Sequence, residues 1–534
     1  MTAPARFVLV LHGHIPDVLG HGVWPHGANW LYEAAAESYL PFLRAVEHLL
    51  ADGVPLRATV GLTPVLCEQL EDPRFAEGFT TYLAQRSDAA EKDGAWLREQ
   101  GDAYAASIAD YWRDLYGSLL EDFGKRGGRI VPSFRALADL RVLEPLGGAA
   151  THGLLPLLPN DRAIERQLDV GLRVHERHFG KRPSGFWLPE CAYRPGGPWP
   201  SPVDGHVEER AGLEEFLAAF GVRYFFVETH LVASGDHIPA YGGRAAGAPN
   251  GTAPWRPHVL RTRAGREVAV FARDPRSSEQ VWSGRVGYPG DGRYLEFHKR
   301  RAPGGHRYWR VTDPRLDLAA KEPWEAGRAA EAVEEHAAHF VRMLGEIPPL
   351  EDGSPPTAVA MFDFELFGHW WHEGVDFLRA VFGTLAESRD VVALTAGEAL
   401  AAAGPPHGAT LPAGTWGRGG DFRVWWNGQT ISYWCEVDDI EKQMERFEAR
   451  KDGIDPALYA ALERATLLVH SSDWPFLIDN EVSKDYALGR IAEHVADFWT
   501  LAQLADEGLP AEGDTAASTI REKDRLFEEE LRRR

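Results

Sequence analysis

The sequence contains very little cysteine. Its 534 residues include only Cys67, Cys191 and Cys435, and no two of them have the CxxC spacing of a structural zinc site. Disulfide frameworks belong to oxidising compartments. Because no pairing pattern is present, we expect a reducing, cytoplasmic location and no structural zinc.

Long apolar runs and an excess of positive charge are also absent. The first apolar run, residues 7–11, is shorter than a signal-peptide core or a membrane span. The net charge of −22 opposes binding to nucleic-acid phosphates and to anionic lipid surfaces. We therefore expect no nucleic acid and no membrane as partner, and a neutral small molecule or polymer as ligand.

Tryptophan, by contrast, is abundant. The chain has 18 tryptophans, and several stand in pairs at 24 and 30, 370 and 371, and 425 and 426. About half of them are expected to fill the core, where the indole N–H needs a partner. The others, with Trp371 as a candidate, suit stacking on the apolar faces of sugar rings. This composition favours a carbohydrate ligand.

Short apolar runs recur along the first 400 residues. They are continuous rather than alternating, as in parallel strands buried on both faces. The predicted strands are 6–14, 56–62, 129–134, 185–190, 223–228, 267–273, 357–365 and 391–395. Helical patterns stand between them, such as 29–53 and 212–221. Repeated β–α units predict a parallel barrel or a doubly wound sheet.

Polar residues at the strand ends favour the barrel. All carboxyl ends of barrel strands open on one face, so these groups would converge on one site. The candidates are His12, His14, Thr63, Ser133, Glu190, Glu228, Arg273, Asp363 and Glu365. A GxGxxG or P-loop motif after the first strand is missing, which argues against a nucleotide-binding sheet.

The alternation of predicted strands and helices stops near residue 405, so we expect two domains. Residues 1–404 are predicted to form the barrel, with long inserted loops at about 191–222, 234–264 and 284–308. Residues 405–534 begin with an aromatic loop, 411–428, and continue with helical stretches. We interpret them as a helical domain that brings aromatic residues to the mouth of the barrel.

Two acids are candidates for chemistry. Glu190 follows the apolar strand that contains Phe186 and Trp187, where desolvation penalises a charge. Asp363 and Glu365 are two apart on a strand among phenylalanines, so they face one side. Burial among aromatic rings raises a carboxyl pKa, as a general acid at neutral pH requires. For Glu365 the simpler interpretation is a buried pair with Arg273 or a histidine.

Five segments, in order, carry a resemblance to a known family. They are HGHIP (12–16), GLTPVLCEQL (61–70), GFWLPECAY (185–193), MFDFELFGHWWHEG (361–374) and LLVHSSDWPFLI (467–478). The chain resembles glycoside hydrolase family 57, in particular its 1,4-α-glucan branching enzymes with an added helical domain. The resemblance implies a distorted (β/α)₇ barrel, no metal cofactor, and α-1,4-glucan such as amylose or glycogen as substrate.

The resemblance also implies roles for individual residues. Glu190 matches the nucleophile of the family, and Asp363 matches its general acid/base. The implied substrate-site groups are His12, His14, Trp30, His152 and Asp473, with Trp282, Trp416 and Trp425 as aromatic contacts. Tyr241 is a candidate for the tyrosine on a mobile loop that shields the covalent intermediate in branching members.

Other functions stay open at this point. An α-amylase or a 4-α-glucanotransferase would use the same two acids. His12 and His14 share a strand face, so a metal-dependent deacetylase or mannosidase-like enzyme is a remote alternative. A non-catalytic glucan-binding protein is another. Cys191 stands beside Glu190, but a cysteine after a buried strand is more often inert packing.

Overall fold

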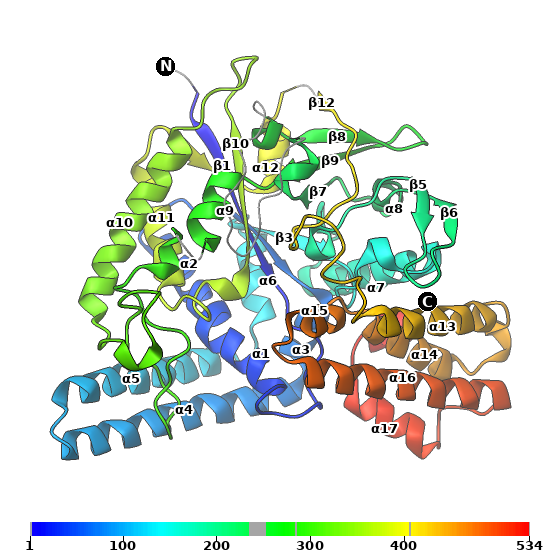
Figure 1. The fold of residues 1–534 in the computed structure, drawn as a ribbon, viewed down its shortest axis with the longest axis horizontal. Helices are drawn as coiled ribbons and strands as arrows, with labels where there is room; N and C mark the ends of the chain where they lie inside the picture. The colour runs from blue at the N-terminus through cyan, green and yellow to red at the C-terminus, as the bar shows by residue number, and fades with distance from the viewer. Residues whose placement is uncertain (1–2, 234–252, 284–285, 405–406, 533–534) are drawn as a thin grey trace.

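Seven parallel strands form the centre of the molecule. The computed structural model describes residues 3–233, 253–283, 286–404 and 407–532 (Figure 1). The strands, in sheet order, are β10 (Thr357–Asp363), β1 (Ala5–Gly13), β2 (Ala58–Leu62), β3 (Leu143–Gly148), β4 (Gly185–Trp187), β7 (Tyr224–Val227) and β9 (Glu267–Ala272). At the edges, β11 (Val391–Ala393) pairs with β1, β8 (His258–Arg261) pairs antiparallel with β9, and β12 (His407–Gly408) pairs with β8.

The sheet curls into a distorted barrel. Its two end strands, β9 and β10, do not pair as a ladder in the described chain, but the backbone N–H of Asp274 donates to the carbonyl of Val359 at 2.8 Å. This hydrogen bond joins the chain just after β9 to β10, across the gap between the two end strands. The predicted (β/α)₇ barrel is therefore confirmed, with one incompletely closed seam.

Helices connect the strands and cover the outside of the sheet (Figure 1). They are α1 (Ala28–Ala34), a π-helical turn η1 (Ala35–Tyr39), α2 (Leu40–Ala51), α3 (Pro64–Glu71), α4 (Pro73–Glu99), α5 (Ala103–Lys125), α6 (Val131–Asp139), α7 (Asp161–Phe179), α8 (Leu213–Ala219), α9 (Pro275–Trp282), α10 (Ala326–Gly345), α11 (Gly374–Glu387) and α12 (Ala396–Ala402). The long hairpin of α4 and α5 is an insertion between β2 and β3 that the sequence patterns did not predict.

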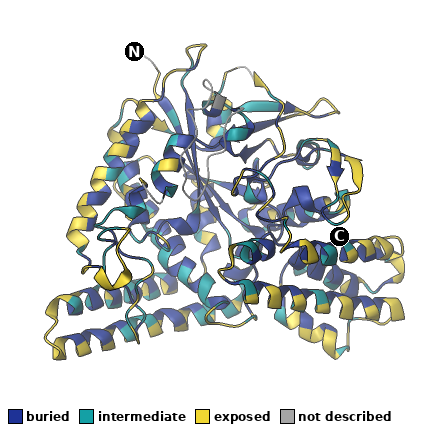
Figure 2. Cartoon of the chain, in the orientation of Figure 1, coloured by how far each residue is buried: buried dark blue, intermediate teal, exposed yellow. Residues whose placement is uncertain are grey.

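The C-terminal part is helical, as predicted. It contains α13 (Ile431–Glu448), α14 (Pro456–Val469), α15 (Asp473–Asn480), α16 (Lys484–Glu507), α17 (Thr515–Lys523) and α18 (Glu528–Arg532). One buried cluster joins the barrel interior, through Trp187 and Trp416, to the interior of these helices at Trp434. Figure 2 shows buried strands and helices with exposed outer faces. Among the described helices, none is long and apolar enough to cross a bilayer.

One predicted strand is wrong. Residues 131–134 of the predicted strand 129–134 form the start of helix α6, and the third strand is β3 instead. Pro132 lies in the first turn of α6, where its missing N–H breaks no helical hydrogen bond. The β3 sequence LEPLGG lacks the usual strand composition because α7 packs closely on it. A Cβ on Gly171 of α7 would lie 2.2 Å from the Gly148 carbonyl oxygen.

The predicted loops and the predicted domain boundary agree only in part with the structure. The segment 191–222 contains the helix predicted at 212–221, which is α8, and also a hairpin of β5 (Gly197–Pro200) and β6 (Val207–Arg210) that the sequence patterns did not predict. Much of the loop 234–264 lies outside the described residues, and Tyr241 lies there too. Strand β12 follows residue 404, so the boundary at 404/405 stays a prediction.

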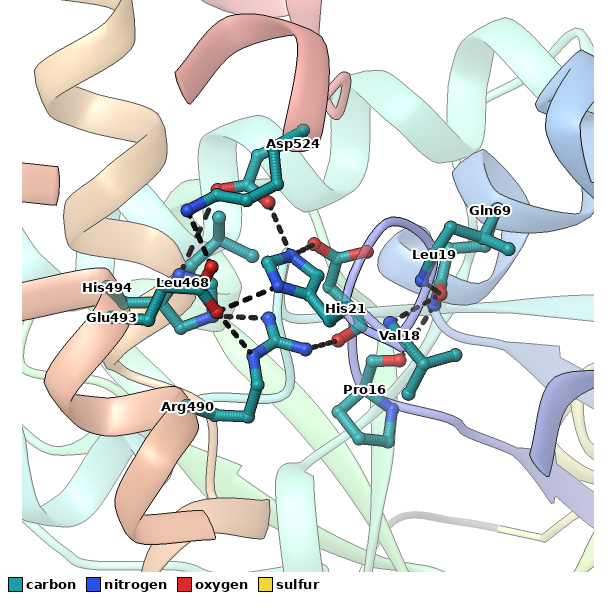
Figure 3. Close-up of polar contacts among 12 residues, drawn as sticks. Pro16, Val18, Leu19, His21, Gln69, Leu468, Arg490, Glu493, His494 and Asp524 are labelled. Atoms are coloured by element: carbon teal, nitrogen blue, oxygen red, sulfur yellow. Dashed lines mark hydrogen bonds and ion pairs between the residues drawn. The ribbon is translucent and has the colours of Figure 1, made fainter. Parts of the chain in front are cut away.

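The segment that follows β1 is hydrogen-bonded both to the barrel and to the C-terminal helices. Gln69 of α3 accepts hydrogen bonds from the Val18 and Leu19 N–H groups, and its amide donates to the carbonyls of Ile15 and Pro16 (Figure 3). Gln69 is fully buried. One side chain thus satisfies four backbone groups of a tight loop that would otherwise be costly to bury.

A buried ionic cluster centred on His21 completes this attachment. The His21 Nδ1 lies 2.9 Å from Glu493, and Nε2 lies 2.7 Å from Asp524 (Figure 3). Arg490 donates to the Asp17 carbonyl at 2.7 Å. Burial alone would lower the pKa of His21, but hydrogen bonds to Asp17, Asp524 and Glu493 outweigh it and raise the pKa from 6.5 to about 10. His21 is therefore a buried cation that joins the barrel to α16 and α17.

The first prediction concerns this cluster. His21→Gln removes the cation but keeps polar atoms, so it should lower the free energy of unfolding at pH 6 by about 3 kcal/mol or more. Because the folded pKa of His21 is raised, its contribution is complete below pH 6.5 and is lost as pH rises towards 10. The deficit of the variant should therefore shrink by up to about 1.4 kcal/mol per pH unit across this window.

Urea unfolding followed by tryptophan fluorescence measures the deficit. The control is His298→Gln, which removes an exposed histidine paired with Glu296. A deficit in His21→Gln that stays constant from pH 6 to 9 would contradict the charge assignment, because it would mean that lost packing causes the effect.

Candidate active site

A cavity of about 250 Å³ lies at the carboxyl ends of the barrel strands. Both parts of the chain line it. The lining residues are His12, His14, Ile15, Pro16, Trp30, His152, Glu190, Asp363, Glu365, His369, Trp370 and Trp416, with Asp473, Phe476 and Leu477 of α15. The structure thus brings together nine of the candidate residues named from the sequence, including Glu190 and Asp363.

Glu190 follows β4 in a strained turn. Its backbone is left-handed, with φ 60° and ψ 23°, a conformation that non-glycine residues rarely adopt. Two donors hold its carboxylate: Trp416 Nε1 lies 2.8 Å from Oε2, and Ser472 Oγ lies 3.2 Å from Oε1. Both donors belong to the C-terminal part, so that part fixes the orientation of an acid carried by the barrel.

Burial and hydrogen bonding act in opposite directions on this acid. Burial raises the pKa of Glu190, the Trp416 hydrogen bond lowers it, and the charge of Asp363 raises it, which together give about 7. Near neutral pH, Glu190 is therefore close to the point of ionisation, and its two donors favour the carboxylate form.

Asp363 is the last residue of β10 and stands opposite His12 in the register with β1. Described residues make no side-chain hydrogen bond to its carboxyl group, in contrast to Glu190. Burial, followed by the charge of Glu365, raises the pKa of Asp363 to about 8. Asp363, which has no hydrogen-bond donor among the described residues, is therefore the acid that stays protonated at neutral pH.

Of the two partners expected for Glu365, Arg273 is wrong, and a histidine takes part only through the backbone N–H of His14. Glu365 accepts hydrogen bonds from the Tyr39 hydroxyl and from the His14 N–H at 3.0 Å. Arg273 forms a buried ion pair with Glu228 instead. Glu228 and Arg273 directly follow the paired strands β7 and β9, which brings them together, whereas Glu365 is held by Tyr39 and by the His14 N–H.

The π-helical turn η1 supports the loop after Asp363. Three consecutive side chains take part: Glu37 lies 2.8 Å from His369 Nδ1, Ser38 accepts from the His369 N–H at 3.2 Å, and Tyr39 donates to Glu365. A π-turn is rare and often marks a functional site. The loop approaches so closely that a Cβ on Gly368 would lie 1.8 Å from the Glu37 carbonyl oxygen.

A chain of hydrogen bonds leads from β1 to Glu190. His12 Nε2 lies 3.0 Å from His152 Nε2, and His152 Nδ1 lies 2.9 Å from Ser472 Oγ. Burial and neighbouring histidines hold the pKa of His12 and of His152 well below 6.5, so both rings are neutral. Since Ser472 donates its only proton to Glu190, His152 donates to Ser472 and accepts from His12.

The predicted aromatic residues divide into two groups. Trp30 and Trp416 line the cavity. Trp282 packs beside Trp370, with ring centroids 6.4 Å apart, and does not line it. Trp371 and Trp425 are each 1% exposed and lie in the core rather than at the substrate site. Trp371 points inward because its neighbour in sequence, Trp370, occupies the cavity side.

Several residues of the site escaped the sequence analysis. Ser472, His369, Trp370, Phe476 and Leu477 lie at the cavity or bond to Glu190. All of them fall within the MFDFELFGHWWHEG and LLVHSSDWPFLI segments, so the ordered segments were the available signal. Tyr39 and Glu37 were not predicted as site residues, because their role depends on a contact between distant parts of the chain.

Cys191 is not a suitable nucleophile. It is 1% exposed, and burial together with the charge of Glu228 raises the pKa of its thiol well above the usual range. The thiolate needed for attack is therefore disfavoured at neutral pH. This cysteine packs in the core beside Trp187.

Of the three residue groups in the described chain that have the spacing of a metal site, one lies at this cavity. Ligand atoms of His14, His152 and Asp473 lie within 4.8 Å of one another. Their lone pairs and protons are already engaged: His14 Nε2 lies 2.8 Å from Asp473, and Ser471 donates to the same Asp473 oxygen at 2.6 Å. Burial would raise the pKa of Asp473, but the charge and hydrogen bond of His14 lower it to about 2. This set fits a hydrogen-bonded pair of His14 and Asp473 better than a metal.

Comparison with known families gives two matches that together span most of the chain. A family model described as "Glycosyl hydrolase family 57" matches residues 8–407. A second, described as "1,4-alpha-glucan branching enzyme, C-terminal", matches residues 436–532.

Individual relatives are similar over nearly the full chain. A 1,4-alpha-glucan branching enzyme of Thermococcus kodakarensis is 39% identical over 503 residues, 92% of this chain and 72% of that protein. The structure of a GH57-type branching enzyme from Pyrococcus horikoshii is 37% identical with a TM-score of 0.89, covering 99% and 96% of the two chains. The alpha-amylase AmyC from Thermotoga maritima is 30% identical with a TM-score of 0.80, covering 99% of each.

The second prediction tests the metal alternative. After removal of bound metal with EDTA and dialysis against zinc, fewer than about 0.1 zinc ions per chain should depend on Asp473, because the Asp473 oxygen that faces His14 is already bonded to His14 and Ser471. Atomic absorption on the wild type and on Asp473→Asn measures this difference. About one zinc per chain that disappears in Asp473→Asn would establish a metal site and remove the hydrogen-bond interpretation.

Proposed function

This chain belongs to glycosyl hydrolase family 57, and from that premise we propose that it is a 1,4-α-glucan branching enzyme. It cleaves an α-1,4 bond and transfers the released segment to a 6-hydroxyl group of a glucan, which creates an α-1,6 branch. One observation carries the chemistry: two buried acids with opposite hydrogen-bonding environments, Glu190 and Asp363, line one cavity. The branching outcome is supported by the C-terminal match and by the branching enzymes among its relatives.

We assign the nucleophile to Glu190. A nucleophile must be ionised and held still, and the hydrogen bonds from Trp416 and Ser472 favour the carboxylate and fix its direction. Asp363 is assigned as the general acid, because burial and the nearby Glu365 keep its proton at neutral pH. The two assignments agree with the roles that the family resemblance implied.

The reaction then has two steps. In the first, a Glu190 oxygen bonds to C1 of a glucose unit, the bond from C1 to the leaving oxygen breaks, and Asp363 gives that oxygen its proton. In the second, the Asp363 carboxylate takes the proton of an acceptor hydroxyl, whose oxygen bonds to C1 and releases Glu190. Two displacements at C1 retain the α configuration.

The acceptor decides which product forms. A glucan 6-hydroxyl gives a branch, a 4-hydroxyl gives a rearranged linear chain, and water gives hydrolysis. Trp30, Trp370, Phe476 and Leu477 form an apolar part of the cavity wall that disfavours bulk water and offers flat surfaces to sugar rings. Tyr241 stays a candidate for shielding the intermediate.

Two other functions within the family remain as alternatives. The similarity to an alpha-amylase over 99% of the chain favours hydrolysis as the second candidate, and a 4-α-glucanotransferase is the third. A non-catalytic glucan-binding protein is disfavoured, because both acids and the donors of Glu190 are present. The cytoplasmic location stays a prediction from the cysteine content.

The third prediction tests the function by its product. Amylose incubated with the protein should gain α-1,6 linkages well in excess of new reducing ends, because the covalent intermediate is transferred to a glucan and not to water. Proton NMR counts both signals in one spectrum. Reducing ends without α-1,6 signals would identify an amylase, and neither signal with redistributed chain lengths would identify a 4-α-glucanotransferase.

Matched variants tie that product to the two acids. Glu190→Gln and Asp363→Asn should each lower the initial rate by roughly 10³-fold or more while circular dichroism stays unchanged. Glu144→Gln is the control, since Glu144 lies on β3 and does not line the cavity. A folded Glu190→Gln variant that retains a tenth of the activity would remove the nucleophile assignment.

The fourth prediction concerns pH. Activity requires ionised Glu190 and protonated Asp363, so the rate should fall below pH 7 and above pH 8, near their pKa values of about 7 and about 8. Trp416→Phe removes the donor that lowers the pKa of Glu190, so the acidic limb should move to higher pH while the alkaline limb stays in place.

Rate measurements on a soluble glucan between pH 5 and 9 resolve both limbs. Trp426→Phe serves as the control, because the Trp426 indole donates to the Pro202 carbonyl and does not line the cavity. If Trp416→Phe lowers the rate equally at every pH, Trp416 acts through substrate contact and not through Glu190.

A further inference from the structure

A second cavity, of about 150 Å³, lies outside the active site between the β5–β6 hairpin and α13. Figure 1 shows this hairpin at the edge of the barrel, next to the C-terminal helices. Its wall includes Arg194, Trp199, His206 and Arg210 from the segment after Glu190, and Asp438 and Lys442 from α13. None of these residues lines the cavity that contains the two acids.

Arg194 is a buried cation without an acceptor. It is 8% exposed, and among the described residues its guanidinium group makes no hydrogen bond or ion pair. It is held instead between aromatic rings, with Cζ 5.0 Å from the Trp199 centroid and 4.9 Å from the Phe422 centroid. Rings of this kind fix the plane of the guanidinium but leave its N–H donors unsatisfied.

Arg210 adds a second unsatisfied donor. It is also 8% exposed, and its Cζ lies 4.4 Å from the same Trp199 ring. Its Nε donates to Asp161 at 2.8 Å and its Nη1 donates to the Leu158 carbonyl at 2.8 Å. The Nη2 group is buried and has no partner. The satisfied atoms anchor this arginine, and Nη2 is left as a donor without an acceptor.

Arg194 and Arg210 place two like charges close together in the wall of this cavity. Burial, followed by the like charge of Arg210, lowers the pKa of Arg194 to about 10. Lys442 is neutralised by Asp438 at 2.5 Å, and the acids Asp204 and Glu208 are exposed at the rim. Two adjacent buried cations are unexpected in a chain of net charge −22.

We propose that this cavity binds a small oxyanion, phosphate or the phosphate group of a phosphorylated sugar, through Arg194 with Arg210 as second donor. A phosphate offers several charged oxygens, which match guanidinium donors and relieve the repulsion between them. The volume admits one such group and little more. The site is separate from the acids that carry the proposed reaction.

The proposed oxyanion site is connected to the active site through two segments of the chain. Phe422, which packs on Arg194, belongs to the same loop as Trp416, the donor to Glu190. Arg194 itself stands four residues after Glu190. An anion that fixes Arg194 therefore stabilises both segments that orient the nucleophile.

Isothermal titration calorimetry of the full chain with inorganic phosphate, at constant ionic strength set with sodium chloride, tests the proposal. The wild type should bind one phosphate with Kd of about 1 mM or tighter. Arg194→Gln should weaken phosphate binding at least about tenfold. Arg194→Lys keeps the charge but loses the paired N–H donors of the guanidinium group, so it should weaken binding less.

The control is Arg423→Gln, which removes an exposed arginine, paired with Asp421, from the same loop and should leave binding unchanged. Absence of binding to the wild type up to about 20 mM phosphate would overturn the proposal. Equal binding by wild type and folded Arg194→Gln would overturn it as well. The Arg194→Lys variant and the wild-type titration keep the test decisive if Arg194→Gln fails to fold.

A second titration distinguishes the source of the anion. If glucose 6-phosphate displaces inorganic phosphate and binds more tightly, the ligand is a sugar phosphate whose hydroxyl groups reach His206 or Asp438 at the cavity wall. If inorganic phosphate alone binds, the ligand is the free anion. Both results uphold the oxyanion site, provided that Arg194→Gln weakens them.

Discussion

The site depends on the pairing of two short segments that are far apart in the sequence and adjacent in the structure. Residues 190–194 follow strand β4, and residues 414–416 belong to the loop before the C-terminal helices. Tyr193 and Gly414 exchange backbone hydrogen bonds at 2.9 and 3.0 Å, and the Trp416 N–H donates to the Glu190 carbonyl at 3.1 Å. This short ladder holds Glu190 in its left-handed conformation, which the local sequence alone would not favour. The barrel therefore supplies the carboxylate, and the C-terminal part supplies the constraint that keeps it in place.

The same cavity gives two buried acids opposite tasks by distributing donors unequally. Burial favours the protonated form of both acids. Glu190 receives N–H and O–H donors, which offset part of that effect and favour the anion. Asp363 receives none from the described residues, and the neighbouring Glu365 is held by Tyr39 and by the His14 N–H, close enough for its charge to favour the protonated form of Asp363. The rare π-turn at Ala35–Tyr39 matters for this reason, because it sets the position of Tyr39 relative to β10.

The sequence predicted what has a local signal and missed what depends on distant contacts. Glu190, Asp363 and His12 could be predicted because a polar residue directly after an apolar strand reaches the carboxyl-end face of a barrel. The third strand could not, because close packing of α7 against β3 requires glycines and conceals the strand composition. Trp371 could not be told from Trp370 by composition, since one faces the core and the other the cavity. Ser472 and Glu228 find their partners only after the chain folds, so their roles follow from tertiary contacts alone.

The loop that contains Trp416 connects three parts of the molecule. Trp416 bonds to Glu190, Phe422 packs on Arg194, and Trp425 lies in the core with its ring under Gly417, where a Cβ would lie 2.6 Å away. Each contact restrains a different point of the loop, so displacement of one strains the other two. Because a carboxylate must be aligned closely with C1 for attack, rigidity in this loop is a requirement of the chemistry. Arg194 in the second cavity packs on this same loop through Phe422, so it helps to fix the loop that holds Glu190 without lining the active-site cavity.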